Sequence, residues 1–241
     1  MSAAIRIVLV DTSHPGNIGA SARAMKNMGL ESLVLVRPQS FPDPEATARA
    51  SGAADLLARA RICASVDEAI GDCGLVVGTT ARARSANWRV LDARAGAAEA
   101  ATFATAKPVA ILFGGERNGL ANEELNRCQA LIRIPANGAY EALNLAQAVQ
   151  IVCYEVRMAM AGAAPVDPCG LPERATADEM QALHSHIERV MRLSGFMHED
   201  NAAQLGARVR RLMMRALPDD GEVRILRGWL AAIERRLGPA E

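Results

Sequence analysis

The sequence has little of several features that mark common protein classes. Aromatic residues make up only 3% of its 241 residues, and none of its five cysteines lies in a CxxC pair. An odd number of cysteines without paired spacing argues against a disulfide framework and against a thiolate metal site. Lysine is also scarce, with only Lys26 and Lys107 among 27 basic residues. Guanidinium groups, which suit phosphate and carboxylate, therefore dominate the positive charge, although a GC-rich genome would produce the same bias.

Long apolar runs are missing as well. Stretches such as Ile5–Val10 and Val109–Phe113 fall far short of the ~20 residues that a membrane span requires. The first residues, MSAAIRIVLV, carry no cleavable signal pattern, so we expect a cytoplasmic protein without a membrane partner. His184 and His186 lie two apart on a predicted helix and point to different faces, so we expect no metal site.

Charge of neither sign is in excess, because 27 basic residues face 27 acidic ones. No global field then draws the protein to nucleic acid or anionic lipid, and any such binding must come from local patches. With 50% hydrophobic residues, the chain can fill one full core and that of a small appendage.

Short runs rich in β-branched residues and leucine alternate with longer helical or alanine-rich segments. The runs cover residues 5–10, 33–36, 75–78, 109–113 and 131–134. This alternation predicts an α/β domain with a mostly parallel sheet. The clearest predicted helices cover residues 18–28, 44–59 and 143–160. In such sheets ligands usually bind at the carboxyl ends of the strands, where this chain has glycine, asparagine and threonine loops.

A stretch rich in proline and glycine separates this domain from a helical tail. Residues 161–175 hold three prolines and two glycines, which cannot continue the preceding helix. We therefore predict a domain over residues 1–160, a linker over 161–175 and a small all-α domain over 176–241. Because such a small unit is marginal on its own, we expect it to lean on the larger domain or on a second subunit.

Three apolar stripes at helical spacing predict that the small domain is a three-helix bundle. Thr176 and Glu179 form a capping box ahead of the first stripe, which ends near Gly195. The other two stripes consist of Leu205, Val209, Leu212 and Met213, and of Val223, Leu226, Leu230 and Ile233.

Standard phosphate-binding and hydrolase motifs are absent. No GxGxxG follows a strand, and neither GxxxxGK[ST] nor GxSxG occurs. The first predicted strand runs instead into DTSHPGNIGASARAMKNMG, residues 11–29. Gly16 and Gly19 allow a close backbone approach at this strand-to-helix turn, and we expect Asn17 to cap the helix. Arg23 lies within the helix, where an isolated arginine is more often a solvated residue than a catalytic one.

Two later strands also end in loops with reactive side chains. The segment LFGGERNGL, residues 112–120, places Glu116 and Arg117 between glycines at the carboxyl end of a strand, where pocket residues gather. An ordinary β-turn would explain the glycines but not this acid–base pair. The segment IPANGAYEALNLAQA, residues 134–148, is by itself only a strand, a loop and a helix. Together the three loops predict one composite pocket.

These segments resemble the SPOUT methyltransferase superfamily, specifically its TrmH-like branch of RNA ribose 2′-O-methyltransferases. Within that branch, four segments are similar to the bacterial TrmJ family of tRNA methyltransferases. They are TSHPGNIGASARAMKNMG, VVGTTARAR, FGGERNGL with the following NEEL, and LNLAQAVQIVCYEVRMA. The resemblance covers roughly residues 1–160, and the helical extension after them also agrees with that family.

The resemblance implies a SPOUT fold with a carboxyl-terminal trefoil knot, S-adenosylmethionine as cofactor, S-adenosylhomocysteine as product, no metal and a homodimer. It assigns Arg23 as the catalytic arginine, with Asn17 and Glu116 in support. It places the cofactor against Thr79, Thr80, Ala81, Gly114, Glu116, Ile134, Leu143, Asn144 and Leu145. Ala142 stands where the family typically carries serine, so a hydroxyl contact from that position is missing.

The chemistry of arginine limits what Arg23 can do. Its pKa above ~12 leaves almost no neutral base at pH 7. We expect Arg23 to place positive charge beside the nascent 2′-alkoxide, while a phosphate or Glu116 receives the proton. The alternative is that neighbouring cations lower the pKa of Arg23 itself.

The same resemblance implies a tRNA substrate, methylated on cytidine or uridine at position 32 of the anticodon loop. Phosphate contacts are expected from local arginines, namely Arg82, Arg84, Arg208, Arg210 and Arg211. The alternative is that these arginines are solvated and paired with nearby acids, and Trp88 either stacks on a base or packs in the protein. Two other functions stay open: a 23S rRNA ribose 2′-O-methyltransferase of the same branch, and a catalytically silent RNA-binding module.

Overall fold

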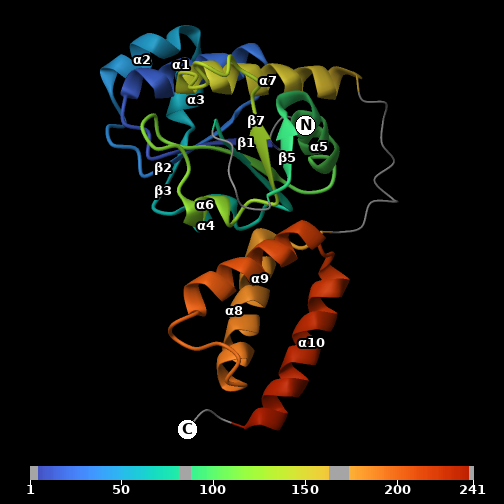
Figure 1. Ribbon diagram of the computed structural model, residues 1–241. Helices are drawn as coiled ribbons and strands as arrows, with labels where there is room; N and C mark the ends of the chain where they lie inside the picture. Colours follow the sequence, from blue (N-terminus) through green and yellow to red (C-terminus); the bar gives the residue numbers. More distant parts are fainter. Residues whose placement is uncertain (1–4, 82–87, 163–173, 239–241) are drawn as a thin grey trace.

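A seven-stranded parallel sheet forms the first part of the molecule. The computed structural model describes residues 5–81, 88–162 and 174–238 (Figure 1). The strands are β1 (Ile5–Val10), β2 (Ser32–Val36), β3 (Arg61–Cys63), β4 (Leu75–Thr79), β5 (Val90–Asp92), β6 (Val109–Phe113) and β7 (Ala130–Arg133). Their order across the sheet is β3-β2-β1-β6-β4-β7-β5. Because all pairs are parallel, the carboxyl ends of β1, β6, β4 and β7 lie side by side at one edge.

Helices cover both faces of this sheet (Figure 1). One face carries α1 (Pro15–Asn27), α2 (Pro44–Ala50), α3 (Ala54–Ala58), α5 (Ala93–Phe103) and α7 (Leu145–Gly162). The other face carries α4 (Val66–Ile70) and α6 (Asn122–Leu125). Alternate residues of β1 serve the two layers: Ile7 and Leu9 belong to the cluster with α1, whereas Val8 and Val10 belong to the cluster with α4. Burial on both sides explains why the strands are continuously apolar.

The chain enters α1 through a tight junction. His14 caps the helix by accepting a hydrogen bond from the Gly16 N–H at 3.2 Å, and Pro15 occupies the first helical position. A Cβ atom on Gly19 would lie 2.0 Å from the carbonyl oxygen of Ala46, so only glycine allows α1 and α2 to pack this closely. The expectation that Asn17 caps this helix is wrong, because Asn17 lies inside α1 and its side chain binds elsewhere.

Three further helices form the small carboxyl-terminal region, α8 (Ala177–Leu193), α9 (Ala202–Ala216) and α10 (Asp220–Leu237). The capping box predicted for α8 is present, with Thr176 Oγ1 accepting from the Glu179 N–H at 3.2 Å. The buried core of this bundle consists of Ala175, Met180, Leu183, Val190, Met214, Val223 and Leu230. Leu212 departs from its predicted core position and is 51% exposed, because α9 turns Met214 inward instead.

The bundle lies against the α4 side of the sheet (Figure 1). The first N–H groups of α8, from Ala177 and Asp178, donate to the carbonyls of Cys73 at 2.9 Å and Gly71 at 3.1 Å. Lys107 Nζ donates to the carbonyl of Arg174 at 2.6 Å. Backbone contacts at the start of α8 thus fix the bundle to the corner between α4 and β4.

The sequence predicted the architecture well but not its short elements. The α/β class, the mostly parallel sheet and the helical tail are confirmed, as are all five predicted strands to within a residue or two. The strands β3 and β5 were not predicted, because three residues carry no periodicity. The helix expected over residues 44–59 is wrong as one element, since it is interrupted by a 3₁₀ turn, η2 (Ser51–Ala53), with Ser51 at φ 51°.

Four of the five cysteines are described, and each is a buried free thiol: Cys63, Cys73, Cys128 and Cys153. Burial raises the pKa of Cys73 and of Cys153 to about 12, so these thiols stay protonated and act as small apolar core residues. Among the helices described here, none has both the length and the apolar character that crossing a membrane would require.

Candidate active site

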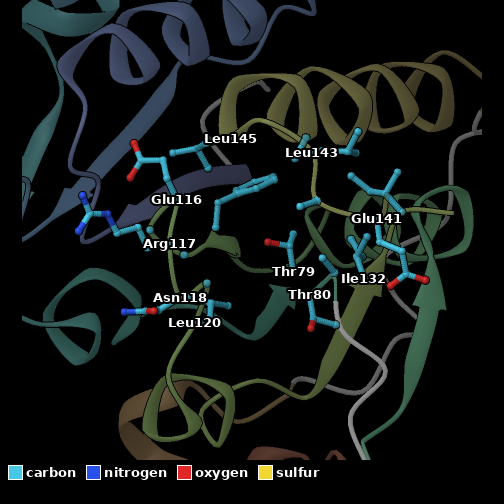
Figure 2. Close-up of a pocket in the computed structure, with 18 residues that line it drawn as sticks. Thr79, Thr80, Glu116, Arg117, Asn118, Leu120, Ile132, Glu141, Leu143 and Leu145 are labelled. Carbon is cyan, nitrogen blue, oxygen red and sulfur yellow. The ribbon is translucent and has the colours of Figure 1, made fainter. Parts of the chain in front are cut away.

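Three turns that are distant in the sequence meet at the carboxyl edge of the sheet. The first follows β1, the second follows β6, and the third lies between β7 and α7. A cleft opens there between the ends of β4, β6 and β7 and the start of α7 (Figure 2). It is lined by Thr79, Thr80, Ala81, Phe113, Gly114, Gly115, Glu116, Arg117, Asn118, Gly119, Leu120, Ile132, Ile134, Glu141, Ala142, Leu143, Leu145 and Ala148. Of the three loops predicted to form one pocket, residues 112–120 and 134–148 line this cleft, whereas residues 11–29 supply none of its lining and meet it only through hydrogen bonds to Glu116.

Glu116, in the second turn, forms hydrogen bonds to residues of the first turn. Its Oε2 accepts hydrogen bonds from the N–H and the Oγ of Ser13, both at 2.9 Å. Its Oε1 accepts from Asn17 Nδ2 at 2.8 Å and from the His14 N–H at 3.2 Å. Burial by itself raises the pKa of Glu116, but the hydrogen bonds from Ser13 and Asn17 outweigh it and lower this pKa to about 2. The carboxylate is thus ionised and engaged on both oxygens.

Asn17 extends this network to the third turn. Its Oδ1 accepts a hydrogen bond from Asn144 Nδ2 at 3.0 Å, and Asn144 Oδ1 in turn accepts from the Ala146 N–H at the start of α7. Glu116, Asn17 and Asn144 therefore form one chain of hydrogen bonds, whose two bonded pairs lie 99 and 127 positions apart in the sequence. This chain fixes the relative position of the three turns.

The second turn is closed by a backbone contact that only glycine permits. A Cβ atom on Gly114 would lie 2.1 Å from the carbonyl carbon of Gly119 and 2.2 Å from the Leu120 nitrogen. Gly119 itself has φ 65°, in the left-handed region that favours glycine. The glycines of LFGGERNGL therefore serve the fold of the turn, and this fold presents Glu116 outward.

The walls of the cleft combine apolar side chains with polar backbone. Ile132 and Leu145 are apolar and buried, while Thr79 Oγ1 donates to the Leu112 carbonyl at 3.0 Å. At the far side, Glu141 Oε1 accepts from Arg133 Nη2 at 2.6 Å. Such a cleft suits a ligand with a flat apolar part and a few polar groups.

Arg23 does not line this cleft. It is an exposed residue of α1 and borders a second, neighbouring hollow between α1 and α7, which is lined by Ala20, Arg23, Ala24, Asn27, Leu143, Asn144, Ala146, Gln147, Gln150 and Ile151. Leu143 lines both hollows and so marks where they meet.

The residues predicted to contact the cofactor line the cleft, except for Asn144, which borders the second hollow. Sequence reasoning missed Phe113, Leu120 and Ile132. Ile132 and Phe113 could have been found from their places in or at the end of predicted strands, whereas nothing in the sequence indicated that Leu120 faces inward.

The predicted RNA-binding arginines occupy different settings. Arg82 and Arg84 lie outside the described residues. On α9, Arg208 is exposed, whereas burial lowers the pKa of Arg210, which stands near Arg127 and Asp67 of the larger domain. Arg211 lies over the ring of Trp88, 5.6 Å from its centroid. Trp88 is partly buried against the core. Of the two interpretations given above, stacking on a base or packing in the protein, this position agrees with packing.

Comparisons with known proteins agree over both parts of the chain. Residues 4–154 match the SpoU rRNA Methylase family, and residues 178–241 match the C-terminal domain of the tRNA methyltransferase TrmJ. The tRNA (cytidine/uridine-2′-O-)-methyltransferase TrmJ of Yersinia pestis is 45% identical over 236 residues, 96% of this chain and 92% of that protein. The crystal structure of TrmJ from Z. mobilis ZM4 has a TM-score of 0.84 at 32% identity and covers 95% of this chain and 98% of that chain.

A more distant solved structure carries a ligand. It is an AdoMet-bound rRNA methyltransferase from Sinorhizobium meliloti, with 26% identity and a TM-score of 0.52 over 66% of this chain and 57% of that chain.

Proposed function

This chain belongs to the SpoU methylase family, and from that premise we propose that it transfers a methyl group from S-adenosylmethionine to the ribose 2′-oxygen of cytidine or uridine in tRNA. The observation that carries the proposal is the hydrogen-bonded chain Glu116–Asn17–Asn144, which aligns the cleft with the hollow that holds Arg23. A donor in one hollow and an acceptor in the other would meet at Leu143. Close approach of this kind supplies much of the rate in methyl transfer.

The cleft fits S-adenosylmethionine by its chemistry. Ile132 and Leu145 offer apolar walls for an adenine ring, and Thr79 and Gly114 bring polar backbone to the same cleft. The ionised carboxylate of Glu116, which also lines the cleft, favours a positively charged sulfonium. When bound, this cofactor supplies an electrophilic methyl group and needs no metal to activate it. Its site is formed by Thr79, Thr80, Ala81, Gly114, Glu116, Ile134, Leu143 and Leu145, with Asn144 beside it.

Arg23 and Glu116 have different roles in the proposed reaction. Arg23 places its positive charge where the ribose 2′-oxygen becomes negative, which lowers the pKa of that hydroxyl. Glu116 has no role as proton acceptor here, because a carboxyl with a pKa of about 2 and four donors holds a proton poorly at neutral pH. Its part is to hold Ser13 and Asn17 in place. An RNA phosphodiester is a still weaker base, so the proton of the 2′-hydroxyl is released to water as the methyl group is transferred.

A homodimer would complete this site. The hollow around Arg23 is wide and open, and the neighbouring face of α7 leaves Tyr154 48% and Met158 50% exposed. Exposed apolar side chains beside a reactive arginine fit a surface that a second copy covers. Light scattering at micromolar concentration tests this directly, because the proposal requires twice the mass of one chain.

The carboxyl-terminal part of the sheet domain is proposed to be threaded as a trefoil knot. Two insertions support this: β6 lies between β1 and β4, and β7 lies between β4 and β5. Each insertion places a later strand between two earlier ones, which is the arrangement that a threaded chain would have. Pulling both ends of residues 1–160 apart in a single-molecule experiment would leave a tightened knot and a shortened contour, whereas an unknotted chain would extend fully.

The tRNA substrate is favoured over ribosomal RNA by the bundle. The TrmJ domain match covers residues 178–241, and the TrmJ relatives span nearly the whole chain. A catalytically silent module is disfavoured because the Glu116–Asn17–Asn144 chain is intact. We propose that the bundle, residues 176–241, is a separate domain joined by the linker 161–175, and that Arg208 and Arg211 contribute to RNA docking in the cytoplasm, together with Arg82, Arg84 and Arg210.

Mass-spectrometric mapping of 2′-O-methyl marks in total tRNA from a strain lacking this gene tests the function. We expect a single mark to be lost, at pyrimidine 32 of the anticodon loop, and to return when the gene is restored. A loss confined to 23S rRNA would instead establish the ribosomal alternative. Unchanged marks in both RNA classes would contradict methyl transfer altogether.

A further inference from the structure

Arg37 lies outside the cleft and connects the turn after β1 with α6, the short helix that follows the turn 112–120. It follows β2, beside β1, and it is not among the described residues that line either hollow. Its Nε and Nη2 donate to the two oxygens of Asp11 at 2.8 and 2.9 Å, and Nη2 also donates to Glu124 Oε1 at 2.8 Å. One guanidinium therefore connects the end of β1 with α6.

Both partners in this contact have unusual backbone. Asp11 has φ 53° and Arg37 has φ 49°, in the left-handed region that residues other than glycine rarely adopt. Such a conformation is strained for these residues and persists only where the surroundings hold it. Here the Arg37–Asp11 pair and the hydrogen bond from the Gln39 N–H to the Thr12 carbonyl at 3.1 Å hold the two segments together.

Asp11 contacts the turn that carries Glu116 near its start, and Glu124 forms a hydrogen bond just after its end. The carbonyl oxygen of Asp11 lies 2.7 Å from where a Cβ atom on Gly115 would stand, so the two backbones are in direct contact. Two residues after Asp11, Ser13 donates twice to Glu116. On the other side, Glu124 Oε2 accepts from the Ala121 N–H at 2.8 Å, next to Leu120, which lines the cleft (Figure 2).

The charges explain why an arginine is required. The Glu124 side chain is only 10% exposed, so its carboxylate needs a cation close by. Arg37 must serve this buried acid and the half-exposed Asp11 together, which a planar fork with several donors can do. A lysine ammonium could reach one acid but not span both with the same geometry.

We propose that Arg37 is a positioning residue for methyl transfer, which holds Asp11 and Glu124 so that the turn 114–120 stays aligned with Ser13. It does not touch the reacting atoms and acts through the placement of Glu116 and of the cleft wall. This inference rests on the proposed function, but its structural part can be measured without RNA.

The experiment compares Arg37→Gln and Arg37→Lys with the matched control Arg59→Gln. Arg59 is also a partly exposed arginine paired with a carboxylate, Asp55 at 2.9 Å, but it lies at the end of α3. Hydrogen exchange without ligand reports on the Ser13 and His14 amides, calorimetry gives the S-adenosylmethionine Kd, and methylation of tRNA gives kcat and KM.

For Arg37→Gln we expect faster exchange at Ser13 and His14, a weaker Kd for S-adenosylmethionine, and a kcat lower by roughly 10- to 100-fold, as misplacement of about 1 Å produces. The KM for tRNA should stay within about twofold, because the proposal gives Arg37 no part in RNA binding. Arg37→Lys should fall between, and Arg59→Gln should match the wild type. Wild-type exchange and kcat in Arg37→Gln would overturn the proposal.

A double variant separates positioning from simple stability. Arg37→Gln leaves Glu124 buried without its cation, and Glu124→Gln removes that charge. If the only effect of Arg37 were to neutralise Glu124, the double variant would regain both thermal stability and kcat, which would refute positioning. The proposal expects stability to recover while kcat stays low, because Asp11 is still released. A wild-type protein that methylates no tRNA would refute the proposed function instead, and the exchange and Kd measurements would still decide the role of Arg37.

Discussion

The cleft and the helical bundle are stabilised in contrasting ways. In the cleft, backbone touches backbone at Gly114 and Gly115, and Glu116 accepts hydrogen bonds on both of its oxygens. The bundle has a small core and meets the larger domain through the start of α8 and through exposed or half-buried side chains such as Arg211. The cleft, which must position reacting groups closely, is built from constrained backbone. The bundle, which we propose docks on a large RNA, relies more on side chains.

The largest change in activity is expected on removal of the Arg23 side chain. Arg23→Ala should lower kcat on the order of 10³-fold, because it removes the positive charge beside the developing alkoxide. The Kd for S-adenosylmethionine should stay within about twofold, since Arg23 borders the second hollow and not the cleft. Single-turnover methylation and calorimetry measure the two quantities. Arg49→Ala, which changes an exposed arginine on the neighbouring helix α2, is the control. An equal loss of cofactor affinity would contradict this division of roles.

Two glycine substitutions test the contrast in backbone packing directly. Gly114→Ala would force a Cβ atom to within 2.1 Å of the Gly119 carbonyl carbon, so we expect a loss of about 2 kcal/mol or more in the free energy of unfolding, together with loss of cofactor binding. Gly228 lies inside α10 with nothing within 4 Å of its would-be Cβ, so Gly228→Ala should stabilise the protein by about 0.5–1 kcal/mol. Denaturant titration measures both. Equal effects at the two positions would remove the contrast.

Acid should weaken the bundle before it weakens the cleft. Burial, with a smaller contribution from Arg210, lowers the pKa of His184 to about 3, so the folded bundle keeps this histidine neutral. Because the unfolded chain takes up the proton near pH 6.5, stability is complete above that pH and falls as pH drops toward 3. Glu116, with its pKa of about 2, loses its contribution only between about pH 4.5 and pH 2.

The measurement is the free energy of unfolding of the bundle from pH 7 to pH 5, followed by hydrogen exchange of α8. We expect a loss of up to about 2 kcal/mol in the wild type, which follows from 1.5 pH units at 1.36 kcal/mol each. His184→Leu should flatten this dependence, whereas His198→Leu, at an exposed histidine of the same region, should leave it unchanged. A wild-type bundle with the same stability at both pH values would show that His184 does not titrate on unfolding.

The sequence predicted the features that depend on local signals. Local signals, such as the apolar runs of the strands and the capping box at Thr176, predicted elements that the structure has. The convergence of the three turns was predicted because the carboxyl ends of parallel strands share an edge. The family resemblance, not periodicity, singled out Arg23.

Contacts between distant residues could not be read from the sequence. Asn17 fits a cap by local rules, yet its side chain binds Glu116 and Asn144 because α1 begins earlier, at Pro15. Arg37 carries no motif at all, and its importance arises from Asp11 and Glu124, which lie far from it in the chain. Similarly, nothing local distinguished the half-buried Arg210 from the exposed Arg208 on the same helix.

The smallest expected effect concerns that last distinction. Arg208 is exposed on α9 and reaches an RNA phosphate from the docked bundle, whereas Arg210 is half-buried near Asp67 and reaches one only when the bundle shifts. Arg208→Ala should weaken tRNA binding a few-fold and reduce the slope of log K against log salt by about 1, as the loss of one phosphate contact requires. Fluorescence anisotropy over a salt series gives the slope, with Arg192→Ala on α8 as the control. If Arg208→Ala leaves the slope unchanged while Arg210→Ala lowers it, the half-buried arginine contacts RNA, and the bundle must then leave its docked position when tRNA binds.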